Sequence, residues 1–142
     1  MSTITLQNGI EMPIVGLGTW QTINEDGIKA IQGALDAGYR LIDTASAYNN
    51  EEEVGKALEE YFKSGKLSRK DVFITTKLWC NNSRPEDVEP TLRKQLAALR
   101  TDYVDLYLIH HPTAYNMPSF FVAPSPNSMQ IFMSPVDMVA IP

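Results

Sequence analysis

Apolar and polar residues alternate at the start of the chain, a pattern typical of half-buried strands. The alternation surrounds the pair Asn8-Gly9, which suits the positive φ angles of a two-residue turn. Residues 3–12 are therefore expected to form an antiparallel hairpin.

After the hairpin, short apolar blocks take turns with longer stretches that carry apolar residues every three or four positions. A short block is long enough for a buried strand, and the longer spacing places apolar side chains on one helix face. The predicted strands are residues 14–18, 39–43, 72–76 and 103–109. The predicted helices are residues 25–37, residues 51–62 and a third helix with the apolar stripe Val88, Leu92, Leu96 and Leu99.

Two helix ends carry local signals. Gly38 lies where the left-handed C-terminal residue of the first helix belongs. Ser83 precedes Glu86 by three residues, the spacing of a capping box, and Pro85 falls in the first turn of the third helix. We therefore expect the third helix to begin close to Ser83.

The order of strand then helix, three times over, followed by a fourth strand, predicts parallel β/α units in an α/β fold. An open doubly wound sheet and a closed β/α barrel both fit this order. Periodicity alone does not choose between them.

The segment 117–142 differs in composition from the rest of the chain. It holds five of the nine prolines and four of the six methionines, and Asp137 is its one charged residue. Apolar clusters occur in it, but prolines break any helical or strand period, so no further β/α unit is predicted. We expect two regions, a β/α region at 1–116 and a poorly ordered, Pro- and Met-rich tail at 117–142.

Composition narrows the class of protein. The net charge is −5 and the basic residues are scattered, which argues against nucleic acid or an anionic membrane surface as a partner. The sequence has neither a signal-peptide pattern nor an apolar run long enough to span a membrane. A single cysteine, Cys80, cannot form an internal disulfide, and we interpret it as buried rather than reactive. A cytoplasmic protein is expected.

Four polar residues stand where parallel β/α folds build their active sites, at the C-terminal strand ends and in the loops that follow. They are Asp43, Tyr48, Lys77 and His110. A carboxylate can pair with a partly desolvated lysine, and the lysine cation favours the phenolate of a nearby tyrosine. Such a tyrosine can exchange a proton with a carbonyl or alcohol oxygen, which the histidine would orient.

Each of these residues also has a purely structural interpretation. Asp43 could cap a loop, Lys77 could reach solvent, Tyr48 could be packing, and His110 could be a satisfied strand-end histidine. Their joint occurrence at successive strand ends favours the catalytic interpretation.

Four motifs together resemble the aldo-keto reductase family. They are GLGTW (16–20), YRLIDTASAYNNEEEVG (39–55), TTKLW (75–79) and DYVDLYLIHHP (102–112). The resemblance covers residues 3 to about 115. It implies a partial (β/α) barrel of about four units behind an N-terminal hairpin, and NADPH-dependent reduction of aldehydes and ketones to alcohols.

The resemblance also implies roles for individual residues. Asp43, Tyr48, Lys77 and His110 would form a catalytic tetrad with Tyr48 as the proton donor, tuned by Lys77 and Asp43. The nicotinamide would lie near Gly18, Thr19, Trp20 and Asp43. The pocket for a small carbonyl substrate would be lined by Trp20, Tyr48, Trp79, His110 and His111, and no metal is expected. Many relatives carry tryptophan where this chain has His111, so substrate preference does not transfer. The glycines of GLG lack the third glycine of a dinucleotide fingerprint and could equally serve tight strand packing.

A barrel of eight units needs about 250 residues, more than this chain supplies. The loops after strands 7 and 8, which usually bind phosphate, would be missing, and two strands would be left as open edges. We therefore interpret the chain as a truncated isoform or altered gene product. It could be a reductase, an inactive half-barrel with a binding or regulatory role, an unstable product, or a half-barrel that associates with a second copy through its open edges.

Overall fold

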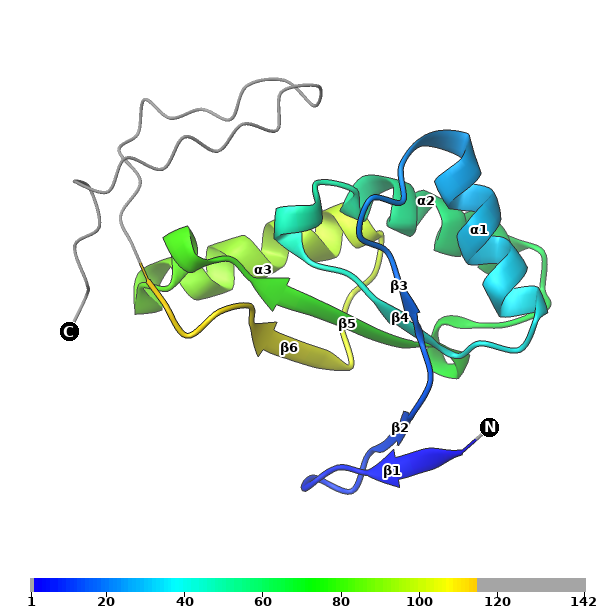
Figure 1. Ribbon diagram of the computed structural model, residues 1–142, viewed down its shortest axis with the longest axis horizontal. Helices are drawn as coiled ribbons and strands as arrows, with labels where there is room; N and C mark the ends of the chain where they lie inside the picture. The colour runs from blue at the N-terminus through cyan, green and yellow to red at the C-terminus, as the bar shows by residue number, and fades with distance from the viewer. Residues whose placement is uncertain (1, 115–142) are drawn as a thin grey trace.

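The protein is described by a computed structural model in which residues 2–114 are placed, and the expected tail at 117–142 lies outside them. A small hairpin precedes a four-stranded parallel sheet and its three helices (Figure 1). The strands are β1 Thr3–Thr5, β2 Glu11–Pro13, β3 Leu17–Gly18, β4 Leu41–Asp43, β5 Phe73–Leu78 and β6 Leu106–Ile109. The helices are α1 Asn24–Asp36, α2 Glu51–Lys63 and α3 Pro85–Leu99, with the short 3-10 turns η1 Ser46–Tyr48, η2 Arg69–Asp71 and η3 Cys80–Asn82.

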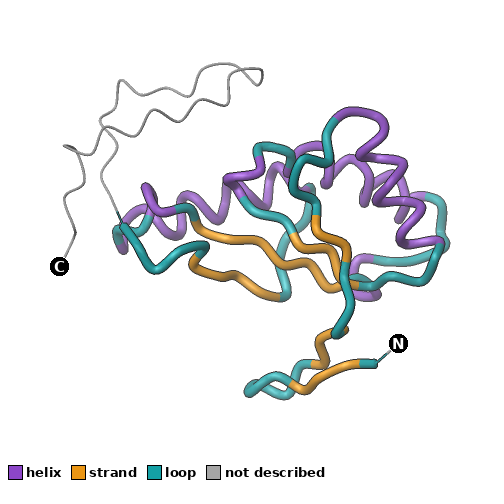
Figure 2. Tube along the Cα trace, viewed as in Figure 1, coloured by secondary structure: helices purple, strands orange, loops and turns teal. Residues whose placement is uncertain are grey.

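The strand order decides between the two architectures that the sequence left open. The sheet runs β3-β4-β5-β6, so each parallel strand pairs with the next one along the chain. All three helices lie on one side of this sheet (Figure 2), and α2 packs against both α1 and α3. A doubly wound sheet would reverse its strand order and carry helices on both faces. The arrangement is that of a partial β/α barrel, as the resemblance implied.

The core fills the space between the helices and the sheet. It is formed by Ile31, Leu35, Ile42, Val54, Ala57, Leu58, Tyr61, Val72, Ile74 and Leu99. Along β4 and β5, Ile42 and Ile74 point toward the helices, whereas the residues on either side of them point to the opposite, inner face. This alternation puts Asp43 and Lys77 on the inner face of the sheet.

The hairpin is confirmed, but its turn differs from the prediction. The Gly9 N–H donates to the Leu6 carbonyl, and the Leu6 N–H donates to the Ile10 carbonyl, both at 2.8 Å. Within this loop only Gly9 has a positive φ, +82°, so the loop has three residues and ends in a glycine bulge. The expected two-residue turn, which needs positive φ at Asn8 as well, is wrong.

The strand expected at residues 14–18 is confirmed only at Leu17 and Gly18. The Ile14 N–H donates to the Ser2 carbonyl at 3.1 Å, which extends the hairpin ladder by one bond. The apolar run is thus divided between the hairpin and the sheet, and it leaves Ile14 and Val15 more than half exposed.

Helix ends gave one correct and one wrong prediction. Gly38 adopts φ +95°, and the N–H groups of Gly38 and Tyr39 donate to the carbonyls of Leu35 and Ala34, which is a Schellman cap. The capping box at Ser83 is wrong, because α3 begins at Pro85 and the Ser83 hydroxyl donates instead to the Cys80 carbonyl at 3.1 Å.

The fourth strand begins at Leu106 instead of Tyr103, and an arginine side chain binds the residues that precede it. The Arg69 guanidinium donates to Asp105 Oδ2 at 2.7 Å and to the Tyr103 carbonyl at 2.9 Å, and it stacks 3.9 Å above the Tyr103 ring. Asp105 Oδ2 also accepts the Ile74 N–H at 2.8 Å. These contacts fix the N-terminal ends of β5 and β6, at the end of the sheet opposite the strand ends that carry the polar residues.

Candidate active site

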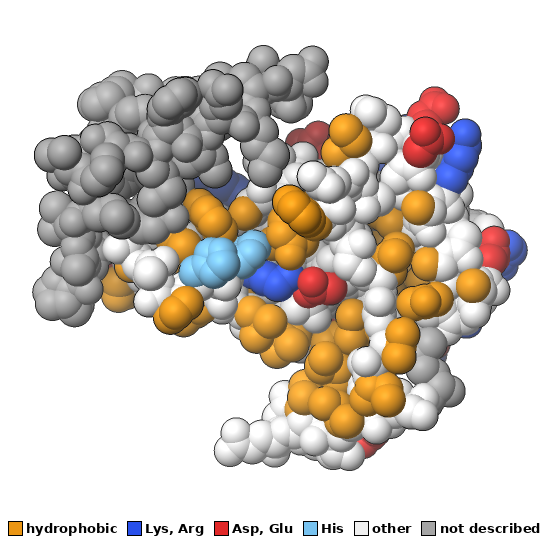
Figure 3. Space-filling view, viewed as in Figure 1, with side chains coloured by type: hydrophobic (Ala, Val, Ile, Leu, Met, Phe, Trp, Pro, Cys, Tyr) orange, Lys and Arg blue, Asp and Glu red, His pale blue; other side chains and the backbone are white. Residues whose placement is uncertain are grey.

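Asp43 ends β4, Lys77 is the fifth residue of β5 and His110 follows β6 directly. Tyr48 ends the 3-10 turn η1 between β4 and α2. The structure brings these four predicted residues together at one rim of the sheet. In Figure 3, the two histidines of the chain lie beside a basic and an acidic side chain on the visible face.

Lys77 is the hub of the group. Its Nζ lies 2.8 Å from both Asp43 carboxylate oxygens, 3.1 Å from the Thr44 carbonyl and 3.2 Å from the Tyr48 hydroxyl. The Lys77 side chain is 14% exposed and that of Asp43 is 36% exposed. An ammonium group this far from bulk water interacts with the Tyr48 oxygen more strongly than a surface lysine would. Lys77 thus places a shielded positive charge within hydrogen-bonding distance of the Tyr48 oxygen.

The backbone around Tyr48 explains how a loop residue reaches Lys77. The Tyr48 N–H donates to the Ala45 carbonyl, and Asn49 adopts a left-handed φ of +52° that ends the short turn. The Ser46 hydroxyl donates to the Lys77 carbonyl at 3.1 Å, so the turn is tied to the strand that carries the lysine.

A buried asparagine holds the loop that carries Trp20. Asn50 is 1% exposed, and its Nδ2 donates to the carbonyls of Thr19 at 2.6 Å and Thr22 at 2.8 Å. Thr19 is itself fully buried, and both its N–H and its hydroxyl donate to the Asp43 carbonyl. These bonds fix the loop between β3 and α1 against the end of β4.

His110 lies in an aromatic cluster over the site. Its ring centroid is 5.7 Å from that of Tyr48, 5.0 Å from that of Trp79 and 4.8 Å from that of His111. Burial lowers the pKa of His110, and the charges of His111 and Lys77 lower it further, against the opposing effect of Asp43. His110 is thus held as a neutral imidazole near neutral pH, able to donate one hydrogen bond.

The two glycines of GLG have different surroundings. A Cβ on Gly16 would lie 2.1 Å from Leu41 Cδ2, so the Leu41 side chain occupies the space that a larger residue would need. A Cβ on Gly18 would meet no atom within 4 Å, and Trp20, two residues later, is 58% exposed. Gly18, Trp20 and the Asp43 carboxylate therefore border open space beside Lys77.

A second polar cluster, which the sequence did not reveal, lies on the helix side of β5. Glu51, the first residue of α2, accepts hydrogen bonds at Oε1 from the Thr76 hydroxyl at 2.6 Å and from Gln95 Nε2 at 3.1 Å. The Tyr107 hydroxyl donates to Gln95 Oε1 at 2.8 Å. Burial raises the pKa of Glu51, and burial together with Glu51 raises the pKa of Tyr107 to about 12. Gln95 interrupts an otherwise apolar stripe of α3, and this was the one available signal.

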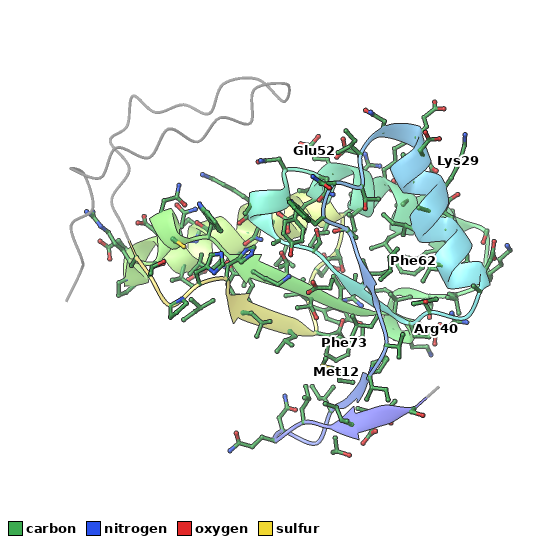
Figure 4. The ribbon with its side chains drawn as sticks, viewed as in Figure 1. Met12, Lys29, Arg40, Glu52, Phe62 and Phe73 are labelled. Carbon is green, nitrogen blue, oxygen red and sulfur yellow. The ribbon has the colours of Figure 1, made fainter. Side chains whose placement is uncertain are left out.

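Replacing Glu51 by glutamine is expected to change how stability depends on pH. The raised pKa means that the folded state binds this proton more tightly than the unfolded state does. Glu51 thus contributes stability that is complete below its unfolded pKa and is lost as pH rises through its folded pKa. The Glu51→Gln protein should match wild type in acid and exceed its free energy of unfolding at neutral pH. Urea unfolding at several pH values tests this, with exposed Glu52→Gln as the control (Figure 4). Parallel pH curves for wild type and Glu51→Gln would contradict it.

The described residues were also expected to include a buried cysteine, no metal site and no membrane span. Cys80 is 2% exposed, with Sγ 3.6 Å from the Thr113 hydroxyl, so the buried interpretation is confirmed. Residues 2–114 contain no group of three or more side chains that could hold a metal ion. No helix in that range is long and apolar enough to cross a membrane.

Comparison with known proteins identifies the family. The sequence model of the Aldo/keto reductase family matches residues 14–132. The chain belongs to this family. It is 51% identical over 115 residues to aldo-keto reductase family 1 member A1 of Mus musculus, a match that covers 80% of this chain and 35% of the relative. This aldo/keto reductase chain thus spans about a third of the length of that curated relative.

Solved structures agree with the fold of this aldo/keto reductase chain. The aldose reductase of Schistosoma japonicum superposes with a TM-score of 0.79 at 42% identity, over 83% of this chain and 39% of that one. The Bombyx mori aldo-keto reductase in complex with NADP superposes with a TM-score of 0.76 at 41% identity, over 81% of this chain and 39% of that one. The resemblance that the four motifs indicated, and the partial barrel that it implied, are confirmed.

Proposed function

We propose that this chain carries the acid–base half of an NADPH-dependent reduction of aldehydes and ketones to alcohols. The observation that supports this most is the position of Lys77 Nζ, within 2.8 Å of both Asp43 oxygens and 3.2 Å from the Tyr48 hydroxyl. A phenol so placed can donate its proton to a carbonyl oxygen as the carbon is reduced. Membership in the Aldo/keto reductase family supports an oxidoreductase role for this group over an ion pair of purely structural value.

Each member of the tetrad has a distinct role in the proposal. Tyr48 donates the proton, Lys77 stabilises the phenolate that remains, and Asp43 holds the lysine in place. His110, neutral and beside the Tyr48 ring, donates a hydrogen bond that orients the carbonyl oxygen. Trp20, Trp79 and His111 would border the substrate, and Trp79 lies against both histidines with ring centroids 5.0 and 5.5 Å apart.

The residues around the open space fit the nicotinamide end of NADPH. Gly18 leaves room for a flat ring, the exposed Trp20 offers an aromatic face, and Asp43 offers a carboxylate oxygen to a ribose hydroxyl. Thr19, fully buried, would act by fixing this loop through its bonds to the Asp43 carbonyl. When bound, the cofactor supplies the hydride.

Turnover by the chain itself tests the proposal. NADPH oxidation with a reactive aromatic aldehyde is expected for wild type and should fall by about 10²-fold or more in Tyr48→Phe, the usual contribution of a positioned acid. Tyr39→Phe, a tyrosine that precedes β4 and lies outside the tetrad, is the control and should keep the wild-type rate. Folded wild-type protein that oxidises no NADPH would favour the alternative, a non-catalytic half-barrel with a binding role. Equal rates in wild type and Tyr48→Phe would exclude Tyr48 as the donor.

A further inference from the structure

The buried cluster behind Lys77 contains a carboxyl group that the proposed proton transfer does not use. Glu51 is 8% exposed, and both of its hydrogen-bond donors, Thr76 and Gln95, are uncharged and at most 3% exposed. A buried ionisable group is costly for stability, and uncharged hydrogen-bond donors offset only part of that cost. Its place in the chain indicates what these contacts do.

Glu51 and Thr76 belong to the same two segments that carry Tyr48 and Lys77. Tyr48 lies three residues before Glu51, and Lys77 directly follows Thr76. On the inner face of β5, Lys77 Nζ donates to the Tyr48 hydroxyl at 3.2 Å. On the helix face, the Thr76 hydroxyl donates to Glu51 Oε1 at 2.6 Å. Segment 46–51 is thus joined to segment 76–77 on both faces of the strand.

Gln95 links this contact to the backbone of the lysine itself. Its Nε2 lies 3.2 Å from the Lys77 carbonyl and 2.9 Å from the Thr76 hydroxyl oxygen, besides its bond to Glu51. The Tyr107 hydroxyl donates to the other end of the amide, Oε1, so the NH₂ group must face β5. The raised pKa of Tyr107, about 12, keeps that hydroxyl protonated as a donor.

We propose that Glu51 is a positioning residue that holds Tyr48 and Lys77 at hydrogen-bonding distance by accepting from Thr76 and Gln95. The inference rests on the proposed function and names a residue that supports the same site from outside it. Glutamine at this position keeps an oxygen acceptor of the same reach. Leucine fills a similar volume but leaves the Thr76 and Gln95 donors without that acceptor.

Exchange of the Lys77 ammonium hydrogens tests the inference without reference to catalysis. In protein labelled with ¹⁵N-lysine, hydrogen-bonded and shielded ammonium groups exchange slowly, and Lys77 is such a group at 14% exposure. Glu51→Leu is expected to speed its exchange by about tenfold or more, the size of coupling found within one hydrogen-bonded network. Glu51→Gln and the exposed control Glu52→Gln should leave the exchange close to wild type. All proteins are compared well below their melting temperatures.

A merely structural role would lower the melting temperature of Glu51→Leu and leave Lys77 exchange unchanged, and that result would overturn the inference. If Glu51→Leu does not fold, Thr76→Val removes the same contact from the strand side and should also speed the exchange. Unchanged exchange of the Lys77 ammonium hydrogens in folded Thr76→Val would also overturn the inference.

Turnover is a separate readout. If wild type reduces a carbonyl, Glu51→Leu should lower kcat more than it raises KM, by up to about 10²-fold, the cost of misplacing a catalytic group by 1 Å. An inactive wild type whose Lys77 exchange still responds to Glu51→Leu would count against the proposed function and for the positioning role.

Discussion

Replacing Lys77 by methionine is expected to eliminate carbonyl reduction while the chain stays folded. Methionine keeps the aliphatic part of the side chain but removes the only cation that contacts the Tyr48 hydroxyl within the described residues. The phenolate left by proton donation loses its stabilising charge, and the Asp43 carboxylate then lies near it without a counter-charge. The loss should lie at the upper end of the range for acid–base catalysis, about 10³–10⁴-fold in kcat.

The measurement is the steady-state rate at saturating aldehyde and NADPH, with folding checked by circular dichroism. Lys56→Met, an exposed lysine of α2, is the matched control and should retain wild-type kcat. A Lys77→Met rate within a few-fold of wild type would show that the phenol works without the lysine.

Replacing Gly55 by alanine is expected to destabilise the chain more than most single substitutions. A Cβ at Gly55 would lie 2.2 Å from the Ala98 carbonyl oxygen and 2.7 and 2.8 Å from the carbonyl carbon and Cα of Leu99. These are backbone atoms of α3, so the clash can be relieved only by moving the two helices apart. Overpacking of this kind costs about 1–3 kcal/mol or more of the free energy of unfolding.

Gly33→Ala is the matched control, because it makes the same change in the preceding helix. A Cβ there would meet no atom within 4 Å, and alanine is the better helix former, so a gain of up to about 1 kcal/mol is expected. Urea unfolding of both variants provides the comparison. Equal effects of the two substitutions would mean that α2 and α3 do not approach each other at Gly55.

The sequence predicted the repeating β/α order and the positions of all three helices, because their apolar spacing is regular. It also placed the tetrad correctly at one rim, since parallel strands present their C-terminal ends together. The role of each tetrad residue stays a prediction. The choice of a barrel over an open sheet came from strand order and helix placement, which involve contacts between distant segments.

What the sequence did not reveal shares one physical feature. Glu51, Asn50 and Gln95 act through side-chain hydrogen bonds to partners 12 to 44 residues away, and hydrophobic periodicity carries no information about such pairs. Glu51 in particular lies in the acidic run 51–53, which looks like an ordinary exposed first turn of a helix. The wrong capping box at Ser83 has a similar cause, because the serine found a competing acceptor in the Cys80 carbonyl.

Residues outside the tetrad hold its backbone and loops in place through hydrogen bonds. Ser46 of η1 and Gln95 of α3 both donate to the Lys77 carbonyl, and Asn50 fixes the loop that carries Trp20. These residues give the lysine and the tyrosine one relative position, which acid–base catalysis requires. The partial barrel thus holds Lys77 and Tyr48 in the fixed arrangement that the proposed proton transfer needs.

The most direct test of the central claim follows the hydrogen itself. Wild-type chain is incubated with benzaldehyde and NADPH deuterated at the transferred position of the nicotinamide, and the alcohol is analysed by mass spectrometry. Benzyl alcohol carrying one deuterium at the carbinol carbon is the result we predict, since hydride transfer from the cofactor places the label on the carbonyl carbon. Folded wild-type protein that yields no labelled alcohol above the rate without protein would contradict the account.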